Sequence, residues 1–269
     1  MSGKNGPLVC CGMYAFTRCL QEAWSALLSN LPGHLPAPYN EPFMISFLDR
    51  PEEYHRRNFL FGQTCGYPYI TRLHATHEVL CTPEFNIKGS VGGHYSSWFI
   101  TRANSDRTKL EEFRDSVAVI NTTDSNSGMN VLRHAVSRFA GTGTFFRHVR
   151  VSGSHLSSLK LVGKGAADLA AIDANTYYFA KTQGKIDENA FKIIGQSPYT
   201  MGLPFIIGKT PGAGKGPLVQ AFNRALKTLG PQTRETLCIQ RFTEVSHEDY
   251  LPIHELKQEA ENLGYPLLR

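Results

Sequence analysis

The stretch Asn121–Asn130 joins a strand-like segment to a helical one through a polar turn. Before it, Val117–Ile120 is a short apolar run rich in β-branched residues, which favour strands. After the turn, apolar residues recur at helical spacing: Met129, Leu132, Val136 and Phe139. The order strand, polar turn, helix is typical of α/β proteins, and it constrains the fold more than any other segment of the chain.

The turn itself has the chemistry of an anion site. The first turn of a helix leaves backbone N–H groups unpaired, and these carry roughly half a positive charge. Ser125 and Ser127 add two hydroxyl donors, Asn126 lies between them, and Gly128 allows a ligand to approach the backbone. Such a turn can hold phosphate without a cationic side chain. The simpler alternative is that these residues only cap the helix.

Strand and helix patterns alternate along the whole chain. The predicted strands are 7–11, 43–48, 58–61, 95–102, 117–120, 148–151 and 167–172. The predicted helices are 20–31, 110–115, 157–162, 217–229 and 253–263, while 236–242 fits either structure. This alternation predicts an α/β fold with mostly parallel sheets.

Two further strands run into polar turns. Gln63 and Thr64 follow the predicted strand 58–61, in the position of a ligand crevice at the carboxyl edge of an α/β sheet. His155 follows the strand 148–151 among several serines, so we expect it at the same sheet edge as the turn with Ser125, although a loop histidine is usually only solvated. Asp173 ends an apolar strand and needs a partner: a cationic group of a ligand, a backbone N–H or an arginine.

Composition excludes several classes of protein. The 269 residues include 41% hydrophobic and 19% charged residues, which are globular values, and a net charge of +5 arises from scattered Lys and Arg. We therefore expect no nucleic-acid partner, and an anionic small ligand fits this charge. No run of eighteen apolar residues occurs, so we expect no membrane insertion. The six cysteines are expected to be reduced and mostly buried.

Catalytic, metal and cofactor sites have weak support. The glycine-rich segment Gly208–Gly216 lacks the spacing and the hydroxyl residue of a nucleotide-binding P-loop, and is expected to be a mobile turn. Cys65 could be a nucleophile with His74, His77 or His155 as its base, but a packing cysteine is the simpler reading. The ten histidines show no metal-binding spacing. We predict no catalytic residue, no metal and no cofactor.

Several motifs in this order resemble the phosphate/phosphonate-binding proteins of ABC transporters, which have the type II periplasmic binding protein fold. The resemblance covers nearly the whole chain. Its motifs are Gly62–Pro68, Tyr95–Ser97, Asp124–Gly128, Ser152–His155, Asp168–Asp173 and Gly264–Pro266. The pair formed by the Ser-x-Ser-Gly turn and the Gly-Ser-His turn is the most specific part, and the ending is weak alone.

The resemblance implies two α/β lobes, joined by two crossovers, that close on a ligand in the cleft between them. Lobe 1 is expected to take residues 1–96 and 200–269, and lobe 2 residues 97–199. In that family the serine hydroxyls and the helix N-terminus hold the phosphonate oxygens. The full predicted ligand set is Tyr14, Gln63, Thr64, Tyr95, Ser125, Asn126, Ser127, Gly128, His155 and Asp173.

The predicted function is therefore capture of a small oxyanion, such as phosphate or a phosphonate, for ABC-type uptake. An ABC permease is a candidate partner, and a monomer is expected. The alternatives are a cytoplasmic ligand sensor and a Cys65-dependent enzyme on the same fold. The family is periplasmic, but residues 1–7 do not read as a secretory signal, so a cytoplasmic location is expected if this N-terminus is native.

Overall fold

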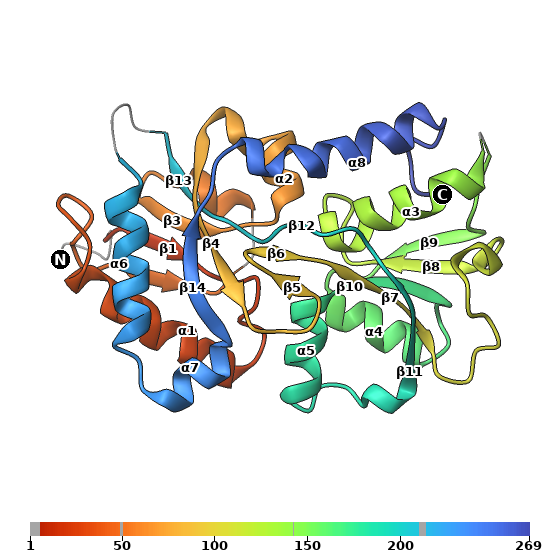
Figure 1. Cartoon of the computed structure of the whole chain (residues 1–269), viewed down its shortest axis with the longest axis horizontal. Helices are drawn as coiled ribbons and strands as arrows, with labels where there is room; N and C mark the ends of the chain where they lie inside the picture. The colour runs from red at the N-terminus through yellow and green to blue at the C-terminus, as the bar shows by residue number, and fades with distance from the viewer. Residues whose placement is uncertain (1–5, 49–50, 142, 210–213) are drawn as a thin grey trace. The chain divides into compact units, whose positions relative to one another are not determined.

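The structure of the chain is a computed structural model that describes residues 6–48, 51–141, 143–209 and 214–269 (Figure 1). Part of the Gly208–Gly216 turn predicted to be mobile, residues 210–213, lies outside the described residues. The chain divides into two compact units. Unit 1 comprises residues 1–86, 91–93 and 202–249, and unit 2 comprises residues 87–90, 94–201 and 250–269.

Unit 1 is built on a sheet with the strand order β14-β4-β13-β3-β1-β2. Its strands are β1 (Leu8–Cys10), β2 (Met44–Ser46), β3 (Phe59–Gln63), β4 (His77–Phe85), β13 (Phe205–Gly208) and β14 (Ile239–Glu244). Its helices are α1 (Arg18–Asn30), α2 (Gly66–Thr71), α6 (Gly216–Lys227) and α7 (Pro231–Leu237). Helix α1 packs against α6 and α7, and α6 packs on β4 and β14.

An aromatic cluster fills the core of unit 1. The ring of Phe222 on α6 lies 5.0 Å from the rings of Phe205 and Phe242, and 6.0 Å from Phe61. Trp24 of α1 reaches Phe205 from another helix, with ring centroids 6.1 Å apart. These contacts fix α1 and α6 on the sheet through apolar burial, the main favourable term in folding.

Unit 2 contains a second sheet with the order β11-β7-β10-β8-β9. Its strands are β7 (Ser97–Arg102), β8 (Val117–Ile120), β9 (His148–Val151), β10 (Leu169–Asp173) and β11 (Phe191–Gln196). The short strands β6 (His94–Tyr95) and β12 (Thr200–Met201) pair with each other, and β5 spans Ser90–Val91. The helices are α3 (Val131–Ala140), α4 (His155–Gly163), α5 (Ala174–Thr182) and α8 (Leu251–Asn262).

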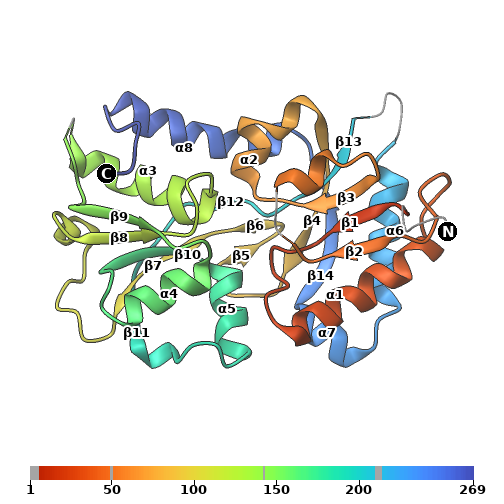
Figure 2. The ribbon, with the colours of Figure 1, turned by 180° about the vertical axis from the view of Figure 1, so that it is seen from behind.

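Alternation along the strands gives the sheet of unit 2 two buried faces. Trp98 and Ile100 of β7 belong to a core cluster with Leu159 and Val162 of α4, the helix seen beside α5 in Figure 2. Successive side chains of a strand point to opposite faces of the sheet, so Phe99, which lies between Trp98 and Ile100, points to the other face. Helix α3 packs against β10 on that face. The strand, turn and helix predicted around Asn121–Asn130 are β8, the turn and α3.

The prediction of mostly parallel sheets is wrong. The pairs β1–β2, β1–β3, β8–β9 and β8–β10 are parallel, but β13 pairs antiparallel with both β3 and β4, and β7 pairs antiparallel with β10 and β11. Chain direction explains the difference. Strand β4 precedes the exit of the chain from unit 1 and β13 follows its return, so the two run in opposite directions, and β7 and β11 are related in the same way within unit 2.

Strand β4 was missed in the sequence because it contains Pro83, which normally argues against an interior strand. Its partner β13 pairs with β4 only as far as Cys81, so Pro83 lies beyond the end of that ladder. On its other side Pro83 is paired with Phe242 of β14. Helix α5 is also absent from the predicted elements, because its hydrophobic pattern is weak and its capping residue, Asp173, fits a candidate ligand as well.

The segment 250–269, which the predicted boundaries placed in lobe 1, packs within unit 2. Helix α8 lies along α3, and Asn130 at the start of α3 donates from Nδ2 to the carbonyl of Ile253 at 3.0 Å. The chain therefore changes unit at 86/87, 90/91, 93/94, 201/202 and 249/250. No sequence pattern marks the last of these passages, because it depends on which apolar face covers α8.

Candidate anion-binding site

The turn after β8 is capped by Ser125. Its Oγ accepts a hydrogen bond from the backbone N–H of Gly128 at 3.0 Å, as expected for an N-cap residue. The next five residues, Asn126–Asn130, form one wide π-helical turn that leads directly into α3. The capping alternative considered from the sequence therefore holds for Ser125, and Ser125 is buried.

Gly128 is required by the close approach of Asn121. A Cβ atom at this position would lie 1.9 Å from Asn121 Oδ1, an oxygen that is buried without a hydrogen-bond partner. Any side chain at position 128 would push the Asn121 side chain out of its place. The structure thus gives Gly128 a packing role in shaping the turn.

Ser127 and His155 come together from two different loops. Ser127 Oγ lies 2.8 Å from His155 Nε2. His155 is the first residue of α4 and follows Ser154, whose side chain caps that helix by accepting from the N–H of Ser157. The sequence expectation that His155 and the Ser125–Gly128 turn meet at the same sheet edge is confirmed by this contact.

The protonation state of His155 follows from its surroundings. Burial lowers the pKa of His155 to about 4, so the ring is neutral at pH 7. Its Nδ1 atom is buried with no hydrogen-bond partner. A buried N–H without an acceptor is less well tolerated than an unpaired acceptor, which favours the tautomer with the proton on Nε2. In that tautomer His155 donates to Ser127 Oγ, so the Ser127 hydroxyl proton points away from His155; Ser125 Oγ lies 3.5 Å from Ser127 Oγ.

Asn126 is held by hydrogen bonds at both ends of its amide. Its Nδ2 donates to Tyr95 Oη at 3.2 Å and to Thr200 Oγ1 at 3.0 Å, and its Oδ1 accepts from Asn130 Nδ2 at 3.0 Å. Tyr95 and Thr200 face each other as partners in the β6–β12 pair. The side chains of Tyr95 and Asn126, both predicted ligands, are thus brought together as parts of one internal network.

The network continues beyond Asn130 to residues that the sequence did not single out. Arg133 Nη2 donates to Asn130 Oδ1 at 2.7 Å, and Arg133 Nη1 donates to the carbonyl of Pro266 at 2.9 Å. Arg133 is buried in the first turn of α3. The sequence offers one signal for the contact between Arg133 and Asn130: the two residues are three positions apart, and residues three apart share a helix face. Thr200 carries no such signal, since only the strand pairing places it beside Tyr95.

Asp173 is the N-cap of α5. Its Oδ1 accepts from the backbone N–H of Thr176 at 2.9 Å, and the side chain is buried. A backbone N–H was the alternative to a ligand cation in the sequence, and the structure supplies that partner. Asp173 therefore has a structural role in this fold, as the cap of α5.

The remaining predicted residues lie in unit 1. Gln63 ends β3 and Thr64 follows it, both fully buried, at the carboxyl end of the parallel pair β1–β3. Gln63 Oε1 lies 3.9 Å from Cys11 Sγ, while Gln63 Nε2 is buried without a hydrogen-bond partner. Tyr14 is buried with its ring edge-on to Phe85 at 5.2 Å.

Cys65 is the N-cap of the short helix α2, and its side chain makes no capping bond. The histidines proposed as its base have other neighbours. His77 contacts the Tyr54 carbonyl at 3.0 Å and Thr76 Oγ1 at 2.9 Å, His74 lies with its ring 5.4 Å from His247, and His155 contacts Ser127. Each of these three histidines thus has a described contact of its own.

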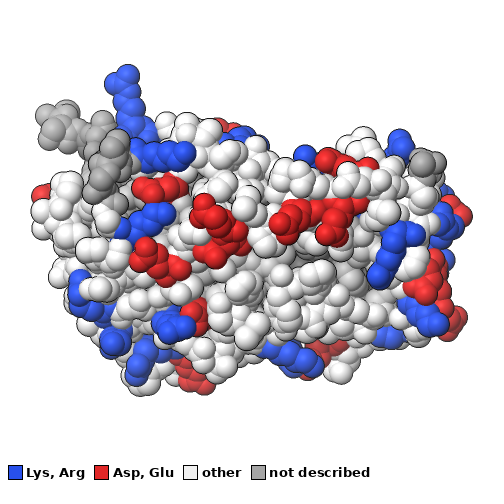
Figure 3. Space-filling view, turned by 45° about the horizontal axis from the view of Figure 1, so that its top comes forward, with Lys and Arg blue, Asp and Glu red and all other residues white. Residues whose placement is uncertain are grey.

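Surface charge is mixed. The face shown in Figure 3 carries both acidic and basic side chains, and no continuous basic area covers the described residues there. Within the described part of the chain, no helix has the length and apolar character needed to cross a membrane.

Comparisons with known proteins show the family of the chain. Residues 19–250 match the family described as "ABC transporter, phosphonate, periplasmic substrate-binding protein". Among curated proteins, no sequence matches this chain.

Three solved structures share the fold at low identity. A binding protein component of an ABC phosphonate transporter from Pseudomonas aeruginosa has 14% identity and a TM-score of 0.75, with 96% of this chain and 88% of that chain covered. PhnD1 from Prochlorococcus marinus in complex with methylphosphonate has 13% identity and a TM-score of 0.74, with 96% and 99% covered. The periplasmic aliphatic sulphonate binding protein SsuA from Escherichia coli has 12% identity and a TM-score of 0.58, with 97% and 87% covered.

These likenesses confirm the α/β, type II periplasmic binding protein fold predicted from the sequence. Because the family match spans most of the residues, the chain belongs to the family of periplasmic substrate-binding proteins of phosphonate ABC transporters.

Proposed function

We propose that this chain binds a phosphonate or phosphate-class oxyanion at the Ser125–Gly128 turn and delivers it to an ABC permease. The carrying observation is the 2.8 Å contact between Ser127 Oγ and His155 Nε2 at a helix start. With the His155 proton on Nε2, the Ser127 hydroxyl is directed away from its histidine and available to donate to an oxyanion. Backbone N–H groups of the first helical turn supply further donors.

The proposed role of each predicted ligand follows from its contacts. Ser127 contacts the anion. His155 orients the Ser127 hydroxyl rather than touching the ligand, since its Nε2 is occupied and its Nδ1 is buried. Asn126 and Tyr95 hold the turn in place through their mutual hydrogen bond. In unit 1, the Nε2 donor of Gln63 is buried without a hydrogen-bond partner.

We propose binding without catalysis. The Ser127–His155 pair lacks the third group that orients a catalytic histidine, because His155 Nδ1 has no hydrogen-bond partner. The family and the similar structures are binding proteins that serve transport. A permease is therefore the expected partner, and the ligand chemistry expected from the complex of PhnD1 with methylphosphonate is that of a small phosphonate.

Isothermal titration calorimetry tests this function with methylphosphonate, 2-aminoethylphosphonate, phosphate and sulfate as separate probes. We expect at least one of the phosphorus oxyanions to bind, and Ser127→Ala to weaken that binding. Ser116→Ala is a matched control, because Ser116 is also buried but donates to the Phe113 carbonyl before β8 begins. Absence of binding by all four anions to the wild type, or equal loss in both variants, would contradict the proposal.

A further inference from the structure

Unit 2 contains a second pocket that the anion-binding turn does not use. It has a volume of about 560 Å³ and is lined by residues of α3, of β7, of the segment after β11 and of the end of α8. These residues are Phe99, His134, Ala135, Ser137, Arg138, Gln196, Ser197, Pro198, Tyr199 and Leu263. None of the predicted ligand residues is among them. The volume lies within the range of pockets that hold small molecules.

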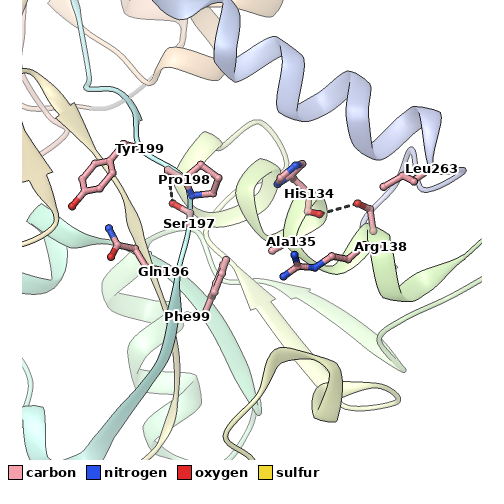
Figure 4. A pocket seen from close by; sticks show the side chains of 10 residues that line it. Phe99, His134, Ala135, Arg138, Gln196, Ser197, Pro198, Tyr199 and Leu263 are labelled. Atoms are coloured by element: carbon pink, nitrogen blue, oxygen red, sulfur yellow. Dashed lines mark hydrogen bonds between the residues drawn. The ribbon is translucent and has the colours of Figure 1, made fainter.

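The pocket exists because α3 does not cover the whole face of the sheet. Phe99 of β7 forms its floor, on the face to which α3 packs. In Figure 4, His134 and Arg138 stand on one side of the Phe99 ring, and Pro198 and Tyr199 stand on the other. Phe99, Pro198 and Tyr199 give this part of the pocket an apolar surface, and Tyr199 is 46% exposed at the edge.

One charged group enters this apolar space. Figure 4 shows the Arg138 side chain extending from α3 toward Ser197 and the Phe99 floor. Its guanidinium lies 4.9 Å from the centroid of the Phe139 ring, and it is exposed. Among the described residues that line the pocket there is no carboxylate. A planar guanidinium beside an apolar wall suits a carboxylate, which it can bind with two parallel hydrogen bonds.

His134 does not compete for that role. Its Nε2 contacts Glu259 Oε2 of α8 at 2.8 Å, which fixes the ring against α8. Its Nδ1 is buried without a hydrogen-bond partner. The ring is thus positioned as a wall of the pocket, and Arg138 is left as the group that can recognise an anion.

From this combination we propose that the pocket binds a small carboxylate with an aromatic or aliphatic body. The carboxylate pairs with Arg138, and the body rests on Phe99 between Pro198 and Tyr199. This site is separate from the Ser125–Gly128 turn and does not depend on the proposed phosphonate binding.

Ligand-detected NMR and calorimetry with phenylacetate test the proposal, with phenylacetamide as the uncharged probe and acetate as the probe without a body. We expect phenylacetate to bind with a Kd on the order of 1 mM or lower, as its small size allows, and both other probes to bind at least about ten-fold more weakly. Arg138→Gln should weaken phenylacetate about ten-fold or more, and Tyr199→Ala should weaken it too. Arg150→Gln, an exposed arginine on β9 at the opposite edge of the sheet, should have no effect.

Competition separates this pocket from the candidate anion site. Ser127→Ala should leave phenylacetate binding unchanged, and saturating methylphosphonate should not displace it. Three results would overturn the proposal: no binding of phenylacetate, equal affinity of wild type and Arg138→Gln, or displacement by methylphosphonate together with loss of binding in Ser127→Ala.

Discussion

Ser127 Oγ and His155 Nε2 lie 2.8 Å apart, although 28 positions separate the two residues in the chain. The serine belongs to the turn after β8 and the histidine to the start of α4, which follows the neighbouring parallel strand β9. Because parallel strands bring their carboxyl ends to one edge of a sheet, two loops that are distant in sequence meet here. The predictions below begin from this contact.

The two serines of the turn should differ in what they control. Ser127→Ala removes the hydroxyl that we assign to the ligand, so affinity for the bound anion should fall about ten- to a hundred-fold, as for a hydrogen bond to a charged group. Ser125→Ala removes the cap of Gly128 N–H and should lower the free energy of unfolding by about 1 kcal/mol. Calorimetry and denaturant unfolding measure the two effects. If both variants lost the same amounts of anion affinity and of unfolding free energy, the two serines would not have the separate roles assigned here.

The stability of the protein should depend on pH through His155. Burial holds its pKa in the folded state at about 4, against about 6.5 in the unfolded chain. As the pH falls, the unfolded chain therefore takes up a proton on His155 before the folded protein does. The contribution of neutral His155 to the free energy of unfolding is complete above pH 6.5 and is lost as the pH falls from about 6.5 to about 4. The loss amounts to at most about 3 kcal/mol. His155→Gln cannot titrate, and urea unfolding at a series of pH values should show a flatter profile for it over this range.

Anion affinity should follow a different pH rule. A bound oxyanion favours the imidazolium form, so the pKa of His155 should be higher in the complex than in the free protein. Protonation of His155 therefore raises the anion affinity by its full amount below about pH 4, and this gain in affinity is lost as the pH rises through the pKa of His155 in the complex. Titrations of wild type and His155→Gln, compared at each pH so that the ionisation of the ligand cancels, should run parallel at high pH and diverge toward acid. Curves that stay parallel down to pH 4 would show that the ligand does not perturb His155.

Asn126 should be a stability residue more than an affinity residue. Asn126→Ala leaves Tyr95 Oη, Thr200 Oγ1 and Asn130 Nδ2 without this partner inside the unit. Each buried hydrogen bond that is lost costs about 0.5–1.5 kcal/mol, so a fall in Tm of several degrees is expected. A double-mutant cycle with Asn130→Ala should be non-additive, because the two amides share one network. Additive losses would show that the network does not act as a unit.

Gly128 and Asn121 should be coupled in the same way. Gly128→Ala places a methyl carbon 1.9 Å from Asn121 Oδ1. The two atoms cannot both keep their positions at this distance, so the substitution should destabilise the protein. Asn121→Gly removes that obstacle, so the double variant should recover part of the stability lost by Gly128→Ala. Thermal unfolding of the four proteins measures the coupling. A double variant as unstable as the sum of the single ones would contradict it.

Closure of two lobes on a ligand remains a prediction from the family resemblance. Small-angle scattering should show compaction when a saturating phosphonate is added, and the same radius with and without ligand would argue against it. The segments expected as hinges, near Tyr95–Ser97 and Ser197–Tyr199, lie within unit 2 beside the chain passages at 93/94 and 201/202.

Local chemistry in the sequence predicted the elements of the turn well and the sheets poorly. Val117–Ile120 and His148–Val151 were expected as strands and are β8 and β9. Strand direction could not be read, because it depends on where the chain enters and leaves each unit. Within the site, the pairing of the Ser127 turn with His155 could be expected from motif order, whereas Thr200 and Arg133 come close to Asn126 and Asn130 only through tertiary packing.

The π-helical turn at Asn126–Asn130 is equivalent to an α-helical turn into which one residue has been inserted. A helix advances about 100° per residue, so one extra residue before α3 rotates all its side chains by that amount relative to an uninterrupted helix. Deleting one residue here would restore a regular helix but turn Leu132 and Val136, now fully buried, away from the sheet. The same rotation would carry Arg138 to a different side of α3. Sequence alignments of this region should therefore place their gaps before residue 131, since a gap inside α3 would compare residues from different faces of the helix.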